Sequence, residues 1–163
     1  MRSKDEFVRL IKENEGIIFK ISRVYASDED DQKDLYQEIV YQLWKSFESF
    51  REESKVSTWM YRVALNTSIS HLNRRNRKEK HHVPIDLDLH IVYDEKDTVM
   101  EERVNMLYAQ IKQLSVVEKG IILLFLEGKN YDDIAAITGF TSSNVGTRLS
   151  RIKQKLKSQI KNS

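Results

Sequence analysis

Cysteine is absent from this sequence of 163 residues, and proline occurs only once. The lack of cysteine excludes a disulfide scaffold, a thiolate metal site and a cysteine nucleophile. One proline and five glycines disfavour a turn-rich β-sandwich and favour a mostly helical chain. No apolar run approaches the roughly 18 residues that a membrane-spanning helix needs, and the N-terminus carries acids where a signal peptide has its apolar core. We therefore expect a helical, cytoplasmic protein without stable membrane insertion.

The net charge is only +2, but the charges are unevenly distributed. Residues 26–50 and 83–107 are rich in acids, whereas residues 62–82 carry six lysines or arginines against Glu79 alone. Residues 141–163 carry six basic residues and no acid. Each stretch alone is well explained as a solvated helix face, but two basic stretches around an acidic one indicate two anion-binding surfaces.

Apolar residues in the first half of the chain recur at intervals of three and four residues, which is the spacing of a helix. The pattern predicts a helix within residues 7–25, then one from an acid-rich start capped by Ser27 to Phe47, and a long helix over residues 58–80. The residues that follow hold the only proline and no helical period. Residues 81–100 are therefore predicted to be an acidic linker.

Helical spacing resumes after the linker and is punctuated by clear start and stop signals. Ser115 and Glu118 match a capping box, and the apolar helix that follows stops at Gly128. Asn130 is positioned to cap a short helix that ends at Gly139. Thr141 or Ser142 caps the last predicted helix. Its predicted buried seam consists of Val145, Leu149, Ile152, Leu156 and Ile160.

The short turn at Gly139 joins two helices into a candidate helix-turn-helix. The second of these helices carries hydroxyl, guanidinium and amide groups on one face, opposite the apolar seam. Such groups hydrogen-bond base edges in the major groove, and flanking cations suit phosphates. An ordinary basic surface helix would show a similar pattern. The predicted face consists of Thr147, Ser150, Arg151 and Gln154, flanked by Arg148, Lys153, Lys155 and Lys157.

The helix predicted over residues 58–80 has a polar face of its own. Trp59 and Met60 stand at its start, and we expect both to lie at least partly in the core. Aromatic side chains beside basic and amide groups suit unstacked bases of a single strand. The polar face consists of Arg62, Asn66, Ser70, Asn73 and Arg77.

Three segments in this order resemble the extracytoplasmic-function (ECF) sigma factors of the bacterial sigma-70 family. They are KDLYQEIVYQLWKSFESF at 33–50, STWMYRVALNTSISHLNRRNR at 57–77 and the run from LSVVEKG to RIKQKL at 114–156. The resemblance implies an all-α protein with a sigma-2 domain over 1–80 and a helix-turn-helix sigma-4 domain over 101–163. It also implies a non-enzymatic factor, without a cofactor, that binds core RNA polymerase and directs initiation at promoter DNA.

The family's acidic helix docks on the clamp helices of the largest polymerase subunit, and its sigma-4 domain meets the flap of the second-largest subunit. Carboxylates beside an apolar strip would match a basic coiled coil. Core packing competes with this role, especially at the two leucines. The docking positions implied by the resemblance are Asp34, Leu35, Gln37, Glu38, Leu43 and Trp44.

The helix that follows in the family reads a melted minus-ten element, and a flipped base enters a pocket formed by the preceding loop, here residues 50–57. Capturing that base offsets part of the cost of opening the duplex. Arg62 and Asn66 are the implied pocket residues. All minus-ten positions implied by the resemblance are Phe50, Arg51, Ser54, Lys55, Trp59, Arg62, Asn66, Ser70, Asn73, Arg74 and Arg77.

The family's sigma-4 helix reads a duplex minus-thirty-five element. Gly146 stands where relatives often carry a longer contacting side chain, so one expected contact is absent. The implied contact positions are Ser142, Ser143, Thr147, Arg148, Ser150, Arg151, Lys153, Gln154 and Lys155. The family also implies an anti-sigma partner that holds the free protein.

Two other functions stay open at this point. A helix-turn-helix repressor acting without polymerase would explain residues 114–160 but gives no role to residues 28–77. A sigma-mimicking regulator that binds an anti-sigma protein would not need Arg62, Asn66 and Arg151. No catalytic or metal site is predicted, because the linker histidines lack ligand spacing and no phosphate-cradling glycine loop is present.

Overall fold

The computed structural model describes residues 3–50, 55–76 and 98–161, and it confirms the all-α class, since none of these residues forms a strand. The chain divides into two compact units, Met1–Leu87 and Asp88–Ser163. Most of the predicted linker lies outside the described residues. Its last residues are already helical, because the first helix after it begins at Thr98.

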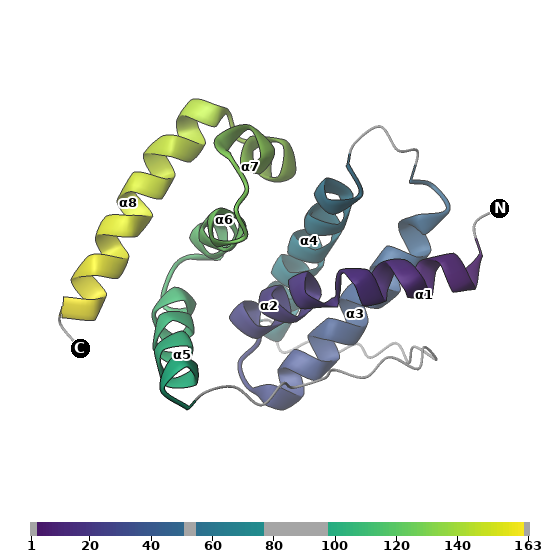
Figure 1. Cartoon of the computed structure of the whole chain (residues 1–163), viewed down its shortest axis with the longest axis horizontal. Coiled ribbons are helices and arrows are strands. Elements are labelled where there is room, and N and C mark those ends of the chain that lie inside the picture. Colours follow the sequence, from purple (N-terminus) through teal and green to yellow (C-terminus); the bar gives the residue numbers. More distant parts are fainter. Residues whose placement is uncertain (1–2, 51–54, 77–97, 162–163) are drawn as a thin grey trace. The chain divides into compact units, whose positions relative to one another are not determined.

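The first unit is built from helices that pack around one another (Figure 1). They are α1 (Lys4–Glu13), α2 (Glu15–Tyr25), α3 (Glu29–Phe47) and α4 (Val56–Asn76). Figure 1 shows α1 and α2 following one another across α3 and α4. Both α3 and α4 pack against α2 and against each other. The predicted helix over 58–80 is therefore confirmed as α4, although its last predicted turn lies outside the described residues.

Two local predictions in this unit are corrected. The single helix expected within residues 7–25 is broken at Asn14, whose backbone leaves the helical region at φ −123° and ψ 16°. Its side-chain Nδ2 donates to the carbonyl oxygen of Leu10 at 2.8 Å. The cap of α3 is Asp28 rather than Ser27, because the Asp28 carboxylate accepts the backbone N–H of Asp31 at 2.8 Å.

The core of the first unit joins apolar side chains with a chain of aromatic rings. The Phe7 ring lies 5.0 Å from Trp44 and 5.3 Å from Phe47, measured between ring centroids. Trp59 stacks on Phe50 at 4.8 Å, which packs the start of α4 against the end of α3. Aromatic pairs at these separations add to the stabilisation from buried area. Among the fully buried side chains are Ile11, Ile18, Leu35, Ile39 and Leu43.

The second unit contains α5 (Thr98–Lys112), α6 (Val116–Leu126), α7 (Tyr131–Thr138) and α8 (Ser142–Lys161). Its predicted caps are confirmed. Ser115 and Glu118 exchange hydrogen bonds at 3.0 and 3.3 Å, and Asn130 accepts the N–H of Asp133 at 2.8 Å. Gly139 ends α7 at φ +86°, a conformation that glycine adopts without strain.

The apolar seam of α8 is confirmed over most of its length. Val145, Leu149 and Ile152 are fully buried, and Leu156 is 9% exposed. Ile160 was also expected in the seam, but it is 52% exposed. The buried part of α8 therefore ends about one turn before the helix does. The buried residues of the earlier turns determine which face of α8 is exposed.

Candidate nucleic-acid and protein-binding interfaces

The structure divides the predicted docking residues of α3 between core and surface. Leu35 and Leu43 are fully buried, which favours the competing interpretation, core packing, at these two positions. They point the same way as Ile39, at intervals of four residues, and fix the orientation of α3 against its neighbours. Asp34 and Gln37 are exposed and Trp44 is half-buried, so these side chains and Glu38 are the predicted docking residues that lie outside the core.

Glu38 belongs to a group of charged side chains that joins α3 to α4, which we name the α3–α4 charge cluster. His71 lies between two carboxylates, with Nδ1 3.0 Å from Glu38 Oε2 and Nε2 2.8 Å from Asp31 Oδ1. Arg75 Nη1 lies 2.9 Å from Asp31 Oδ2, and Arg74 pairs with Glu38 Oε1. Each carboxylate therefore holds two partners from α4.

Asp31 is the most heavily engaged member of this cluster. Besides His71 and Arg75, it accepts the backbone N–H of Ser27 at 2.9 Å. Burial acts to raise the pKa of the Asp31 carboxyl, but the hydrogen bonds from Ser27, His71 and Arg75 and the charge of His71 outweigh burial and lower it. The ionised carboxylate of Asp31 thus ties the N-terminal turn of α3 to the end of α4.

Sequence reasoning missed Asp31, His71 and Arg75. A signal for them was present, because positions 31 and 38 are two turns apart on α3, and 71, 74 and 75 share a face of α4. Pairing them required knowing that these two faces meet, and the ion pairs join residues about 40 positions apart in the chain. No local pattern carries that information.

The polar face predicted on α4 is present as an exposed surface. Arg62, Asn66, Ser70 and Asn73 are exposed, on the side away from buried residues such as Ala64. Phe50 is only 8% exposed and stacks on Trp59, so these two rings support the unit rather than forming an open surface. Lys55 is exposed, and Arg74 is held in the charge cluster. Arg51, Ser54 and Arg77 lie outside the described residues.

The predicted reading face of α8 is also present. Thr147, Ser150, Arg151 and Gln154 are exposed, opposite the buried seam. The Thr147 hydroxyl donates to the carbonyl oxygen of Ser143 at 3.2 Å. At the start of the helix, Ser143 is exposed, while the Ser142 hydroxyl donates to Asp132 on α7.

Two of the cations beside this face, Arg148 and Lys153, lie over aromatic rings. Arg148 Nε donates to Asn144 Oδ1 at 2.6 Å, and its guanidinium lies 4.3 Å from the centroid of the Phe140 ring. The ammonium of Lys153 lies 4.1 Å from the centroid of Phe125. These rings attract a cation without neutralising it. Both charges remain available to an anion.

Lys155 is used differently from its neighbours. Its Nζ lies 2.7 Å from Glu118 Oε2 and ties α8 to the capping box of α6. Burial acts to raise the pKa of the Glu118 carboxyl, but Lys155 and the hydrogen bonds with Ser115 outweigh it and lower the pKa. Lys155 therefore has a structural partner in addition to its predicted DNA role.

Two family models match the two units. Sigma-70 region 2 matches residues 10–78, and Sigma-70 region 4 matches residues 105–156. The chain belongs to the sigma-70 family and is of the ECF type. The region 2 match contains α3 and α4 with the charge cluster, and the region 4 match contains the helix-turn-helix of α7 and α8.

Relatives and solved structures match nearly the whole of this sigma factor. It is 27% identical to the ECF RNA polymerase sigma-E factor of Haemophilus influenzae, over 96% of this chain and 88% of that one. It is 26% identical to the RNA polymerase sigma factor SigV of Bacillus subtilis, over 97% and 93%. The fold resembles CnrH in complex with the cytosolic domain of CnrY, with a TM-score of 0.72, 15% identity, and 99% and 91% coverage. It also resembles the sigma factor RpoE in complex with the anti-sigma factor NepR from Bartonella quintana, with a TM-score of 0.72, 20% identity, and 96% and 97% coverage.

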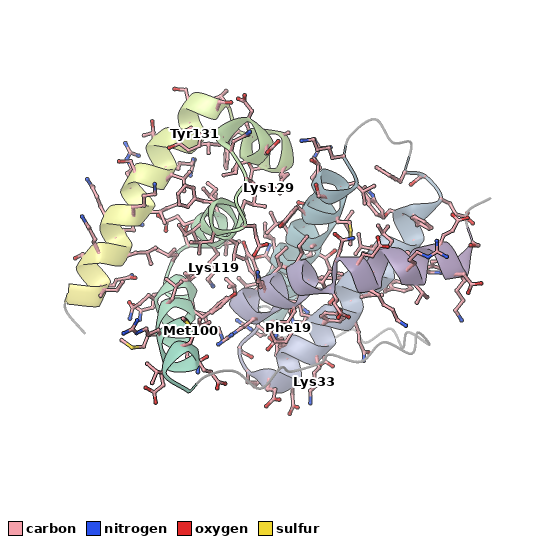
Figure 2. The ribbon with its side chains drawn as sticks, in the orientation of Figure 1. Phe19, Lys33, Met100, Lys119, Lys129 and Tyr131 are labelled. Atoms are coloured by element: carbon pink, nitrogen blue, oxygen red, sulfur yellow. The ribbon has the colours of Figure 1, made fainter. Side chains whose placement is uncertain are left out.

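The glycine in the reading helix of this sigma factor has a packing explanation. A Cβ added at Gly146 would lie 3.2 Å from Cε2 of Tyr131, closer than an ordinary van der Waals contact. Tyr131 is the first residue of α7 and is labelled beside the start of α8 in Figure 2. A side chain at position 146 would therefore require the tyrosine ring to shift by a few tenths of an ångström.

Within the described residues, no helix is both long and apolar enough to cross a bilayer.

Proposed function

We propose that this sigma factor binds core RNA polymerase in the cytoplasm and directs it to promoters with two elements. In this proposal α8 reads a duplex minus-thirty-five element, and α4 reads a melted minus-ten element. The observation that carries it is the reading face of α8. Thr147, Ser150, Arg151 and Gln154 stand exposed opposite a fully buried seam, at the end of a capped helix-turn-helix. Those side chains suit base edges and phosphates of the major groove.

The exposed face of α4 supports the second half of the proposal. Arg62 and Asn66 lie one turn apart, and Ser70 and Asn73 extend the same surface. Donors and acceptors in this pattern suit the edges of unpaired bases. The stacked rings of Phe50 and Trp59 brace the two helices on either side of the predicted pocket loop.

The proposal for protein partners rests on polar side chains of α3 outside the core and on the relatives. Asp34, Gln37 and Glu38 would meet the clamp helices of the largest polymerase subunit, where opposite charge favours docking. The sigma-4 unit would meet the flap of the second-largest subunit. The solved complexes of CnrH with CnrY and of RpoE with NepR support a cytoplasmic anti-sigma partner for this chain as well.

The test is reconstitution with purified bacterial core polymerase. Gel filtration should show a stoichiometric complex, and transcription from a promoter library should yield new start sites that share two sequence elements. Binding without transcription would indicate a sigma-mimicking regulator. Tight, specific duplex binding by the chain alone without polymerase binding would indicate a repressor.

Asn66→Ala separates the two tasks of the first unit. The variant should bind core polymerase like the natural chain but should form open complexes at least tenfold less, because a melted base loses a hydrogen-bonding partner. Gln113→Ala removes a similar exposed amide from the turn before α6 and should leave open complexes unchanged. Loss of polymerase binding in Asn66→Ala would show that α4 has been misassigned.

A further inference from the structure

The Glu38 carboxylate has two roles that compete with each other, binding within the protein and predicted docking on polymerase. It belongs to the predicted polymerase-docking surface, and in the free protein both of its oxygens are already engaged. Oε2 faces His71 Nδ1 at 3.0 Å, and Oε1 pairs with Arg74. A cation on another protein can reach this carboxylate only by sharing or displacing one of these partners.

Arg74 is the partner more easily displaced. Its side chain is 32% exposed, whereas that of His71 is 15% exposed and has a second bond to Asp31. Arg75 is bound to Asp31 and not to Glu38. Among the described residues, Arg74 is thus the member of the cluster whose ion pair is with Glu38 alone. Releasing it would leave the remaining links between α3 and α4 in place.

A released Arg74 would stand next to the candidate DNA surface. It lies one helical turn beyond Ser70 and adjoins Asn73, and both of these side chains are exposed on α4. A guanidinium is well suited to a phosphate oxygen. The same side chain is therefore held by a docking carboxylate in one state and within reach of a nucleic-acid phosphate in the other.

We propose that Glu38 acts as a latch: in the free protein it holds Arg74 away from DNA, and docking of Glu38 on a cationic surface of polymerase frees Arg74 for a promoter phosphate. This inference rests on the proposed function. The coupling is reciprocal, so DNA bound by Arg74 also makes Glu38 more available to polymerase. Because the Glu38–Arg74 ion pair is only partly buried, we expect the coupling to change affinity by a few-fold.

The latch can be tested on the full chain without polymerase. The probe is a fluorescently labelled single strand of about 20 deoxythymidines, and affinity is measured by anisotropy at low salt, where phosphate contacts are strongest. Glu38→Gln should raise affinity about threefold to fivefold. Arg74→Gln should change it little, because Arg74 is already held. The double variant should match Arg74→Gln.

Glu48→Gln is the matched control, because it removes one carboxylate from the exposed residue that ends α3. It changes the net charge equally without touching Arg74, so its affinity should rise less than that of Glu38→Gln. Glu38→Asp is a second release variant, because it keeps the charge but shortens the reach to Arg74. Circular dichroism checks that each variant is folded.

The outcomes separate the latch from the function on which it rests. A gain in Glu38→Gln that persists when Arg74 is also replaced, or no gain in either Glu38 variant, would overturn the latch. Failure of the natural chain to bind core polymerase would instead overturn the proposed function. Polymerase binding together with a gain that requires Arg74 would support both.

Discussion

The two candidate DNA helices hold their cations in different ways. On α4, Arg74 and Arg75 are paired with the carboxylates of Glu38 and Asp31. On α8, Arg148 and Lys153 lie over the rings of Phe140 and Phe125, at 4.3 and 4.1 Å from their centroids. A carboxylate cancels the charge that it holds, whereas a ring orients a cation and leaves its charge in place.

This difference indicates how the two units meet DNA. Arg148 and Lys153 are positioned by rings and still charged in the free protein, which suits a helix that reads an intact duplex directly. The cations at the end of α4 are neutralised until another group takes their carboxylates. Lys155 is the exception on α8, because Glu118 holds it. The comparison therefore predicts a strong duplex-binding role for one unit and a conditional DNA role for the other.

The largest expected effect comes from removing the cations held by rings. Arg148→Ala combined with Lys153→Ala should weaken duplex binding by the full chain about 30-fold at low salt, and should reduce the salt slope by about two. Arg74→Ala combined with Arg75→Ala removes the same formal charge from α4 and should weaken binding far less. The measurement is anisotropy with a labelled duplex over a range of salt concentrations. Equal losses of affinity in the two double variants would contradict the proposed difference between cations held by rings and cations held by carboxylates.

A second prediction tests the carboxylates that neutralise cations in the two units. The pKa of Asp31 is lowered from its ordinary value of 3.8, so its stabilising effect is present above pH 3.8 and is lost as the pH falls through the lowered folded-state pKa. Asp31→Asn should lower the free energy of unfolding by about 1.5 kcal/mol at pH 7 and should flatten its decline below about pH 4.

Glu118→Gln is the counterpart in the second unit, where the pKa is lowered from 4.5. Its cost should be smaller, up to about 1 kcal/mol, and should come mainly from the lost ion pair with Lys155, because glutamine can still accept the Ser115 N–H in a capping box. Both tryptophans, Trp44 and Trp59, lie in the first unit, so their fluorescence during urea unfolding follows that unit while circular dichroism follows both. An Asp31→Asn variant with an unchanged acid decline would contradict the role given to the charge cluster.

Local chemistry explains what could be predicted from the sequence. The capping box at Ser115, the cap at Asn130 and the left-handed Gly139 each depend on residues within four positions of one another. The seam and reading face of α8 follow from helical periodicity alone. The family's motifs then supplied the interpretation of these surfaces.

Tertiary contacts explain what could not be predicted. The resemblance placed Leu35 and Leu43 among the docking positions with core packing as the alternative, and the packing of α3 on its neighbours shows that both side chains are buried. The charge cluster needs two helices to meet, and the break at Asn14 depends on one side chain bonding back to Leu10. Gly146 could be recognised as a departure from the family, but the ring of Tyr131 that lies beside it belongs to another helix.

The smallest expected effect concerns Gly146, the glycine within α8. Gly146→Ala should gain helix propensity, which is worth up to about 1 kcal/mol. Its Cβ would lie 3.2 Å from the Tyr131 ring. Because Tyr131 is 44% exposed, we expect its ring to tilt outward by a few tenths of an ångström. We expect a net stabilisation of about 0.5 kcal/mol in thermal unfolding, with duplex affinity unchanged.

The control is Gly139→Ala, which places a side chain at φ +86° and should destabilise by about 1 kcal/mol. Destabilisation by Gly146→Ala would show instead that Tyr131 is fixed against α8, so that the reading helix is held by α7 as rigidly as α4 is held by α3.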